Sequence, residues 1–407
     1  RLSGLSRYLG ETVEKLGLER FSGNMGRELV NAILPTDDDL ARVIMERGAG
    51  NPLHMSFLIR YLREEGLLEQ GPGQIWKAID LAHVAKAVPP SLADLFRVRI
   101  EQAEAHLNID GRLHRILEFM AVAGLRFQYD VLHGMVQMSG DESVVRHFDY
   151  DLDRLVAEGF ITEIEGRGDD WYSFTHGLLR DYLLKSVGSV VSRTLHRFAA
   201  ESMAAAFGAQ ADSYAMEIAR HWQAAKNTDR ALEWYRRAAE TSVRSYVPQQ
   251  AASAFEEILN IMDGRLGFDD LQDPLLPHLD RPAFARAGIV PREYLDTLAR
   301  LGDLYEGFSE FSRAEESYRR VVRIVGRETT RLEADVIPSL GTCWLGLGHV
   351  AWQRGDFEAA EWAFRKVREL VKRFPQFSEL ETAASRGLAR VMWHRADYDV
   401  ASQLAQA

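Results

Sequence analysis

The stretch Trp171–Asp181 (WYSFTHGLLRD) marks the point where two kinds of sequence meet. Its first half alternates the aromatic residues Tyr172 and Phe174 with hydroxyl side chains, which is the period-two pattern of a strand. Its second half and the residues that follow place leucines at helical spacing. The stretch therefore predicts a short strand that ends at His176 and turns directly into a helix.

The residues before this stretch have the pattern of a winged helix. Three amphipathic helical patterns lie between residues 110 and 159, and two strand patterns, 160–164 and 171–175, follow around a turn at 166–170. In a DNA-binding member of this fold the third helix enters the major groove. Here that segment is rich in acidic residues, namely Asp141, Glu142, Asp149, Asp151, Asp153 and Glu158. Because phosphates would repel them, we expect a packing domain and no nucleic-acid partner.

The first 92 residues predict a compact helical module. Gly50-Asn51-Pro52-Leu53 breaks the chain before an amphipathic helix at 54–65, and Ser91 is a plausible cap for the next helix. The acidic run Asp37–Asp39 could indicate a metal site. We interpret it as a capped helix start instead, because no further ligand lies at suitable spacing.

Beyond Ser189 the sequence is helical and contains an internal repeat. Gly302 and Tyr318 recur 46 positions later as Gly348 and Phe364, within a longer set of matching small and large residues. The pattern resembles the tetratricopeptide (TPR) repeat, in which small residues let two antiparallel helices approach. Four tryptophans also fall at helical spacing here: Trp344, Trp352, Trp362 and Trp393. We expect them to pack in the core, and the alternative is that they stack on a ligand.

Composition limits the classes of function. The chain has 407 residues, of which 46% are hydrophobic, and no run approaches the ~20 apolar residues of a membrane span. The net charge of −11 gives no general attraction to nucleic acid or anionic lipid. A single cysteine, Cys343, excludes an internal disulfide framework and fits a reducing cytosol. We therefore expect a cytoplasmic protein without a membrane partner.

Motifs that would form a self-sufficient catalytic site are absent from this sequence. It contains no G-x-x-x-x-G-K-[ST] loop, H-E-x-x-H, C-x-x-C or G-x-S-x-G motif. Two residues still point to a ligand. Pro52 offers a flat apolar surface to an aromatic base, and His176 offers a ring nitrogen to a phosphate oxygen. Each also has a purely structural interpretation, as a helix start and as a satisfied structural histidine.

The order of these features resembles the STAND class of signal-transduction ATPases, which are regulatory relatives of AAA+ proteins. The break at Gly50–Leu53, the helix start at Val88–Leu92, a winged helix ending at His176 and TPR-like helices follow one another over nearly the whole chain. The nearest relatives look like the bacterial maltose-regulator type and the ATPase–repeat halves attached to some kinases or adenylate cyclases. Leu195–Arg197 and Ala219–Trp222 also resemble that family's linker.

The resemblance implies a nucleotide-dependent switch. The family's G-x-P motif contacts adenine, which places Pro52 and its neighbour Asn51 at an ADP or ATP (with Mg). A histidine at the end of the winged helix contacts the ADP β-phosphate and holds the resting state, and His176 matches it. Thr175 and Gly177 stand where plant and animal relatives carry Met and Asp. The resemblance also implies an upstream P-loop domain, without which stable nucleotide binding is not expected.

The sequence thus predicts a mostly α chain. Its predicted domains are a helical AAA+-type lid (1–92), a winged-helix domain with one small β-hairpin (93–188), linker helices with the first TPR-like hairpins (189–263), a Pro/Gly-rich insertion or hinge (264–293) and TPR-like repeats (294–407). We expect the regulatory part of a STAND-type switch, whose repeats bind a protein or small-molecule activator and which self-associates on activation. The alternatives are a TPR interaction scaffold with no nucleotide role and a winged-helix DNA-binding regulator.

Overall fold

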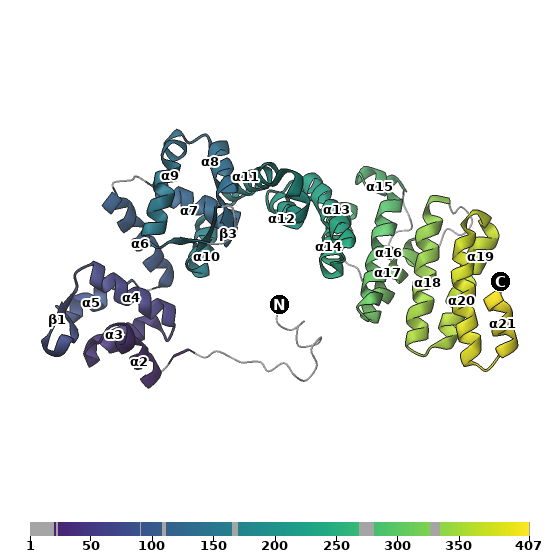
Figure 1. Cartoon of the computed structure of the whole chain (residues 1–407), viewed down its shortest axis with the longest axis horizontal. Coiled ribbons are helices and arrows are strands. Elements are labelled where there is room, and N and C mark those ends of the chain that lie inside the picture. Colours follow the sequence, from purple (N-terminus) through teal and green to yellow (C-terminus); the bar gives the residue numbers. More distant parts are fainter. Residues whose placement is uncertain are drawn as a thin grey trace. The chain divides into compact units, whose positions relative to one another are not determined.

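The computed structural model describes residues 20–21, 23–89, 91–107, 111–164, 170–267, 281–325 and 334–406. Over these residues the chain is mostly α-helical and contains two small antiparallel sheets, which confirms the predicted fold class (Figure 1). Its internal contacts divide it into two compact units, Arg1–Ser189 and Val190–Ala407. In the described part of the chain no helix is long and apolar enough to cross a membrane. The finer domain boundaries, which in places fall outside the described residues, stay predictions.

The first unit begins with a small helical module. Its elements are α2 (Gly23–Ile33), α3 (Asp38–Gly48), α4 (Pro52–Glu64), β1 (Leu68–Gln70), the 3-10 turn Pro72–Gln74, β2 (Trp76–Ala78) and α5 (Leu81–Ala87). Asp37 caps α3 by accepting the backbone N–H of Leu40 at 2.9 Å, as its position in the acidic run predicts. The apolar faces of α3 and α4 meet through the fully buried side chains of Leu40, Met55 and Leu58.

Gly50 fixes the turn that leads into α4. Its φ of +70° lies in the left-handed region, and a Cβ at this position would lie 2.4 Å from the carbonyl oxygen of Phe21. The N–H of Phe21 in turn donates to the carbonyl of Gly50 at 2.9 Å. Only glycine fits this position, so the backbone immediately before Asn51 and Pro52 is tightly determined.

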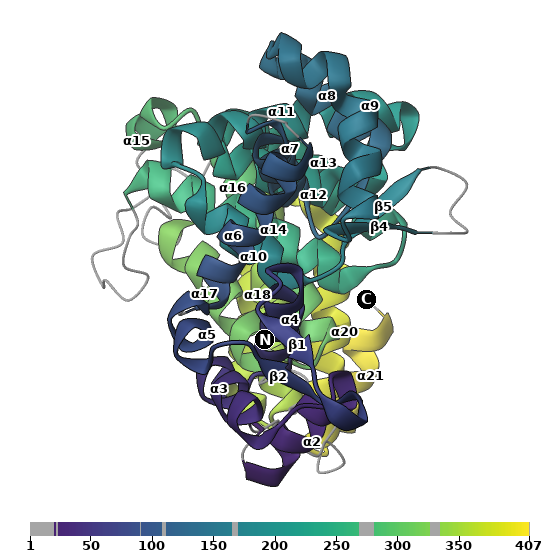
Figure 2. The same ribbon diagram turned by 90° about the vertical axis from the view of Figure 1, so that its left-hand side faces the viewer.

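The second part of this unit has the element order of a winged helix. The elements are α6 (Leu92–Leu107), α7 (Arg112–Ala123), β3 (Arg126–Gln128), α8 (Tyr129–Ser139), α9 (Glu142–Ala157), β4 (Ile161–Glu163), β5 (Trp171–Phe174) and α10 (Gly177–Ser186). The sheet order is β3-β5-β4, and Figure 2 shows β4 and β5 side by side. Phe127 lies opposite Tyr172, and Thr162 lies opposite Ser173. The predicted hairpin is present, although most of its turn lies outside the described residues.

The second unit is a succession of helices, most of which pack against the next helix in sequence. They are α11 (Ser189–Phe207), the 3-10 segment Gly208–Tyr214, α12 (Ala215–Ala224), α13 (Thr228–Arg244), α14 (Pro248–Leu266), α15 (Arg281–Arg286), α16 (Pro291–Gly307), α17 (Phe311–Val325), α18 (Ile337–Gln353), α19 (Phe357–Arg373), α20 (Ser378–His394) and α21 (Tyr398–Gln406). Within the segment 264–293, residues 268–280 lie outside the described residues. Helix α14, which precedes these residues, packs directly against α16, which follows them.

Glycine and aromatic side chains hold the repeats together. The ring of Tyr318 on α17 lies between Gly302 of α16 and Gly346 of α18, where added Cβ atoms would lie 2.4 and 2.3 Å from the ring. The ring of Phe364 on α19 lies in the same way between glycines of α18 and α20. The predicted pairing of small and large residues is therefore confirmed, and each aromatic ring also contacts the following repeat.

The expectation that the four tryptophans are core residues is wrong for two of them. Trp362 is 55% exposed and Trp393 is 63% exposed, while Trp344 and Trp352 are half-buried. On α19 the core positions belong instead to Ala363 and Phe364, which follow Trp362 directly. Periodicity gives the spacing of an apolar stripe, but the contact of Phe364 with the flanking glycines determines which side of the helix faces inward.

Candidate functional site

The predicted adenine contact lies at the start of α4. The Asn51 side-chain oxygen accepts the backbone N–H groups of Leu53 at 3.0 Å and His54 at 3.3 Å, so it caps the helix. Pro52 is the first helical residue, where its missing N–H costs nothing, and it is exposed. The Pro52 ring and the side-chain nitrogen of Asn51 (Nδ2) are therefore the groups that this turn leaves for a ligand.

The predicted phosphate contact, His176, packs against the same helix. It joins β5 to α10 with an extended backbone (φ −136°, ψ 120°), and its side chain does not cap α10. Its ring meets the ring of Phe57 edge-on, with centroids 4.9 Å apart and an angle of 85° between the planes. Phe57 lies on α4, five residues after Pro52. The structure thus brings the junction of β5 and α10 onto α4, the helix that Pro52 begins.

A third residue, Arg99 of α6, contacts the same phenylalanine. Its guanidinium carbon lies 5.5 Å from the centre of the Phe57 ring and 4.5 Å from that of Phe160. One of its terminal nitrogens, Nη2, donates to the carbonyl oxygen of Glu158 at 2.5 Å. Among the described residues no carboxylate forms an ion pair with Arg99. Burial, reinforced by the positive charge of Arg60, lowers the pKa of Arg99 to about 10.

The electrostatics of this cluster suit an anion. Burial and then the charge of Arg99 lower the pKa of His176 below its ordinary value of 6.5. The imidazole is therefore neutral at neutral pH and offers one N–H donor and one acceptor. A half-buried guanidinium with unused donors and a neutral imidazole both border the Phe57 ring. The carboxylates of Glu64 and Glu158 act against the fall in the pKa of Arg99 but form no ion pair with it, and a phosphate group within hydrogen-bond reach would pair with the guanidinium directly.

Motif reasoning found Pro52 and His176 but missed Arg99 and Phe57. The available signal was the position of Arg99 on α6, three and four residues after the buried Phe96 and Leu95 and directly before the buried Ile100. An arginine inside such an apolar stripe has an unusual environment. No motif shows that its partner would be a carbonyl group 59 positions away.

His54, two residues after Pro52, is buried without a hydrogen-bond partner for its Nε2 atom within the described part of the chain. It is 7% exposed, and burial lowers its pKa below 6.5. An unpaired buried polar atom costs roughly 1–3 kcal/mol. The unfolded chain therefore binds the His54 proton more readily than the folded chain, so stability falls as the pH drops below about 6.5.

We expect His54→Leu to stabilise α4 by about 1 kcal/mol, because it removes the unpaired nitrogen while keeping an apolar side chain of similar size. The same change should reduce the loss of stability between pH 7 and pH 5. Hydrogen exchange of the α4 amides at both pH values measures both effects. His83→Leu, on the exposed side of α5, is the matched control. If the pH dependence of stability is the same in His54→Leu as in wild type, His54 is not the group that causes it.

The residues that resemble the family's linker also meet within the second unit. The Nδ1 atoms of His196 on α11 and His221 on α12 lie 2.9 Å apart, so one ring donates to the other. The ring centroids are 5.1 Å apart. This pair ties α11 to α12 ahead of the repeats.

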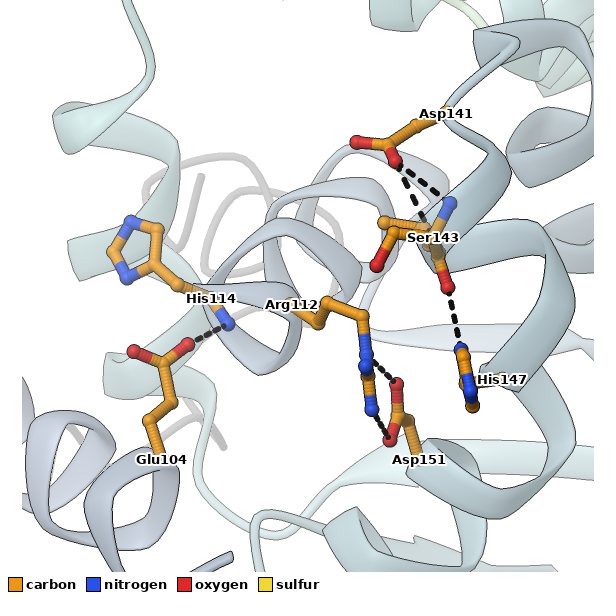
Figure 3. Close-up of polar contacts among 8 residues, drawn as sticks. Glu104, Arg112, His114, Asp141, Ser143, His147 and Asp151 are labelled. Atoms are coloured by element: carbon orange, nitrogen blue, oxygen red, sulfur yellow. Dashed lines mark hydrogen bonds and ion pairs between the residues drawn. The ribbon is translucent and has the colours of Figure 1, made fainter. Parts of the chain in front are cut away.

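The third helix of the winged-helix region, α9, differs from its sequence-based description in one respect. Asp151 is fully buried and accepts two hydrogen bonds from Arg112 of α7, at 2.8 and 3.1 Å (Figure 3). Asp141 caps α9 by accepting the N–H of Ser143 at 3.1 Å. Asp151 therefore does not belong to the acidic surface. The exposed acids of α9 are Glu142, Asp149 and Asp153, and they still oppose a phosphate backbone.

Comparison with protein-family models and with curated proteins finds no match. Among solved structures, the chain is similar to a Signal Transduction ATPase with Numerous Domains (STAND) protein with a tetratricopeptide repeat sensor from Pyrococcus horikoshii. The TM-score is 0.34 and the sequence identity 11%, over 91% of this chain and 59% of that one. The chain thus spans less than two thirds of the length of that protein. A likeness of this degree does not assign the chain to a family.

Proposed function

We propose that this chain is the regulatory and sensor part of a STAND-type, ATP-dependent signalling switch. The observation that supports it best is the contact between His176 and Phe57. Through this contact, the junction of β5 and α10 packs on the helix that starts at Pro52. The neutral imidazole of His176 and the guanidinium of Arg99, with which no described carboxylate forms an ion pair, both lie against the buried ring of Phe57.

In this proposal the chain's residues contact a bound ADP and so hold the switch in its resting state. The exposed ring of Pro52 packs against the adenine, and the amide of Asn51 lies beside it. The neutral His176 donates an N–H to a phosphate oxygen, and Arg99 supplies positive charge to the same group. When bound, the nucleotide supplies the negative charge and, after exchange for ATP, the hydrolysable phosphate. A partner that binds the released form better would shift the population and permit exchange and self-association.

The test is ADP retention by the full product of the gene, which this proposal expects to include an upstream P-loop domain. We expect His176→Ala and His176→Phe to release ADP about tenfold or more faster than wild type, which is the effect of losing one hydrogen bond to a charged group. Bound nucleotide is extracted and quantified after gel filtration at successive times. His83→Ala is the control, because His83 is an exposed histidine of α5.

Each variant isolates one part of the proposal. His176→Phe keeps an aromatic ring against Phe57 but has no ring nitrogen. Retention equal to wild type in this variant would show that His176 acts only by packing. A wild-type protein that holds no ADP would remove the nucleotide role altogether and favour the second candidate.

The second candidate is a TPR interaction scaffold without a nucleotide role. The exposed Trp362 and Trp393 on the repeat helices favour it, because each contacts one aromatic neighbour but leaves more than half of its surface open to a partner. The two candidates differ in the gene upstream of Arg1. A Walker A strand–loop–helix favours the switch, and its absence favours the scaffold.

A further inference from the structure

A groove on the repeats joins exposed aromatic surface to arginine side chains. It encloses about 370 Å³ and is lined by residues of α17, α18 and α19 and of the turn between α18 and α19. Trp344 and Leu347 of α18 and Trp362 of α19 supply large apolar side chains to its lining. Its size falls within the range of sites that hold small ligands or the side chains of a bound peptide.

The aromatic part of the groove is preformed. The rings of Trp344 and Trp362 meet edge-on, with centroids 4.9 Å apart and 83° between the planes. Trp362 nevertheless remains 55% exposed. Tryptophan in a rigid, half-covered position is the type of residue that most often contributes strongly to binding at interfaces. The surface formed by Trp344 and Trp362 can therefore accept an apolar side chain with little rearrangement.

The charged part of the groove carries more positive than negative charge. Arg319 lies 2.5 Å from a carboxylate oxygen of Glu315, and Arg354 contacts the other oxygen of the same carboxylate. One carboxylate thus serves two guanidinium groups. Asp356, the other acid of the groove, accepts the N–H of Ala359 at 3.0 Å as the cap of α19.

Arg323 of α17 adds to the positive charge of the groove. In the described part of the chain no carboxylate forms an ion pair with Arg323, and its side chain is exposed. It lines the groove and also a second cavity of about 210 Å³ formed by α14, α16 and α17. That second cavity is lined by as many acidic as basic side chains, so the excess of positive charge belongs to the groove beside Trp362.

We propose that this groove binds an acidic peptide segment of a partner protein that carries one large apolar side chain. The apolar side chain packs between Trp344 and Trp362, and flanking carboxylates pair with Arg323 and Arg319. The inference deepens the proposed function, on which it rests, by naming the class of partner that the repeats sense. Attraction is local, because salt screens the rest of a chain with a net charge of −11 over about 10 Å.

The test measures direct binding of two matched pools of short fluorescent peptides to the 407-residue chain. Both pools carry a central Leu, Phe or Trp, which is flanked by Asp and Glu in one pool and by Lys and Arg in the other. We expect the acidic pool to bind about tenfold or more tighter by fluorescence polarisation and to weaken at high salt. Equal binding of the two pools, or tighter binding of the basic pool, would overturn the proposal.

Variants locate the binding. We expect Trp362→Ala and Arg323→Glu each to weaken the acidic pool about tenfold or more. Trp393→Ala, at the more exposed tryptophan on α20, and Arg244→Glu, at an exposed arginine of α13, are the controls and should bind as wild type does. Circular dichroism confirms that each variant is folded. Acidic-pool binding that survives both groove variants would place the peptide elsewhere and overturn the proposal. A negative result here leaves the His176 effect on ADP retention intact, so the two proposals fail separately.

Discussion

Gly346→Ala is expected to lower the free energy of unfolding of the repeats by roughly 1–3 kcal/mol, the cost of overfilling a packed core. The new Cβ would lie 2.3 Å from the ring of Tyr318. That ring cannot move away, because its other side meets Gly302 of α16. Its hydroxyl is also fixed, 2.7 Å from a carboxylate oxygen of Asp303 and 3.1 Å from one of Glu306. Two helices must therefore separate to make room for one methyl group.

Gly264→Ala is the matched control for this prediction. Gly264 lies within α14, has no atom within 4 Å of an added Cβ and has an ordinary negative φ. Alanine there should stabilise the helix by up to about 1 kcal/mol, because glycine loses more chain entropy on folding. Urea unfolding followed by circular dichroism compares the two variants. A similar effect of both would show that contact with Tyr318 is unimportant.

The glycines also show how far the sequence predicts the repeats. Gly302 with Tyr318, and Gly348 with Phe364, are recognisable because each pair recurs at the same spacing. Gly346 is not recognisable in this way, because its contact with Tyr318 lies between one repeat and the next. A pattern within a repeat shows which residues are small and large. Only the stacking of α18 on α17 shows that Tyr318 needs glycine on both sides.

The candidate site was predictable to a similar degree. Pro52 and His176 were identified by motif and order, and the contact of His176 with Phe57 places the histidine against the helix that Pro52 begins. Arg99 was not identified, because its significance comes from what surrounds it after folding. Its guanidinium group ends between two aromatic rings and a backbone carbonyl. Strand β3 was also missed, since three residues are too few to display an alternating pattern.

Residues inside the repeats and residues at the candidate nucleotide site differ in how fully the folded chain satisfies them. Around Tyr318 every neighbour is fixed by steric fit, so substitutions there act on stability. Around Phe57, the half-buried His176 and Arg99 keep hydrogen-bonding groups that a ligand could reach. The groove beside Trp362 likewise keeps apolar surface exposed. Surfaces that are poorly satisfied within the folded chain are the reasonable places to look for a ligand and a partner.

Arg112→Met is expected to destabilise the winged-helix region by about 3 kcal/mol or more, because it leaves the Asp151 carboxylate buried without its partner. Asp151 is fully enclosed and receives both of its hydrogen bonds from Arg112, at 2.8 and 3.1 Å (Figure 3). Hydrogen exchange of the α7 and α9 amides measures the loss. Arg146→Met, which breaks a solvent-exposed pair with Glu142, should change little.

The double variant Arg112→Met/Asp151→Leu tests whether the pair itself or its isolated members set the cost. Two apolar side chains of similar volume can replace a buried ion pair with little loss, so we expect the double variant to recover most of the stability that Arg112→Met loses. A double variant that loses the sum of the stabilities lost by the two single variants would contradict this expectation. Recovery would mean that Asp151 serves to join α9 to α7 and does not contribute negative charge to the protein surface. It would also mean that the acidity of α9 in the sequence overstates the acidity of its surface, where Glu142, Asp149 and Asp153 carry the repulsion toward nucleic acid.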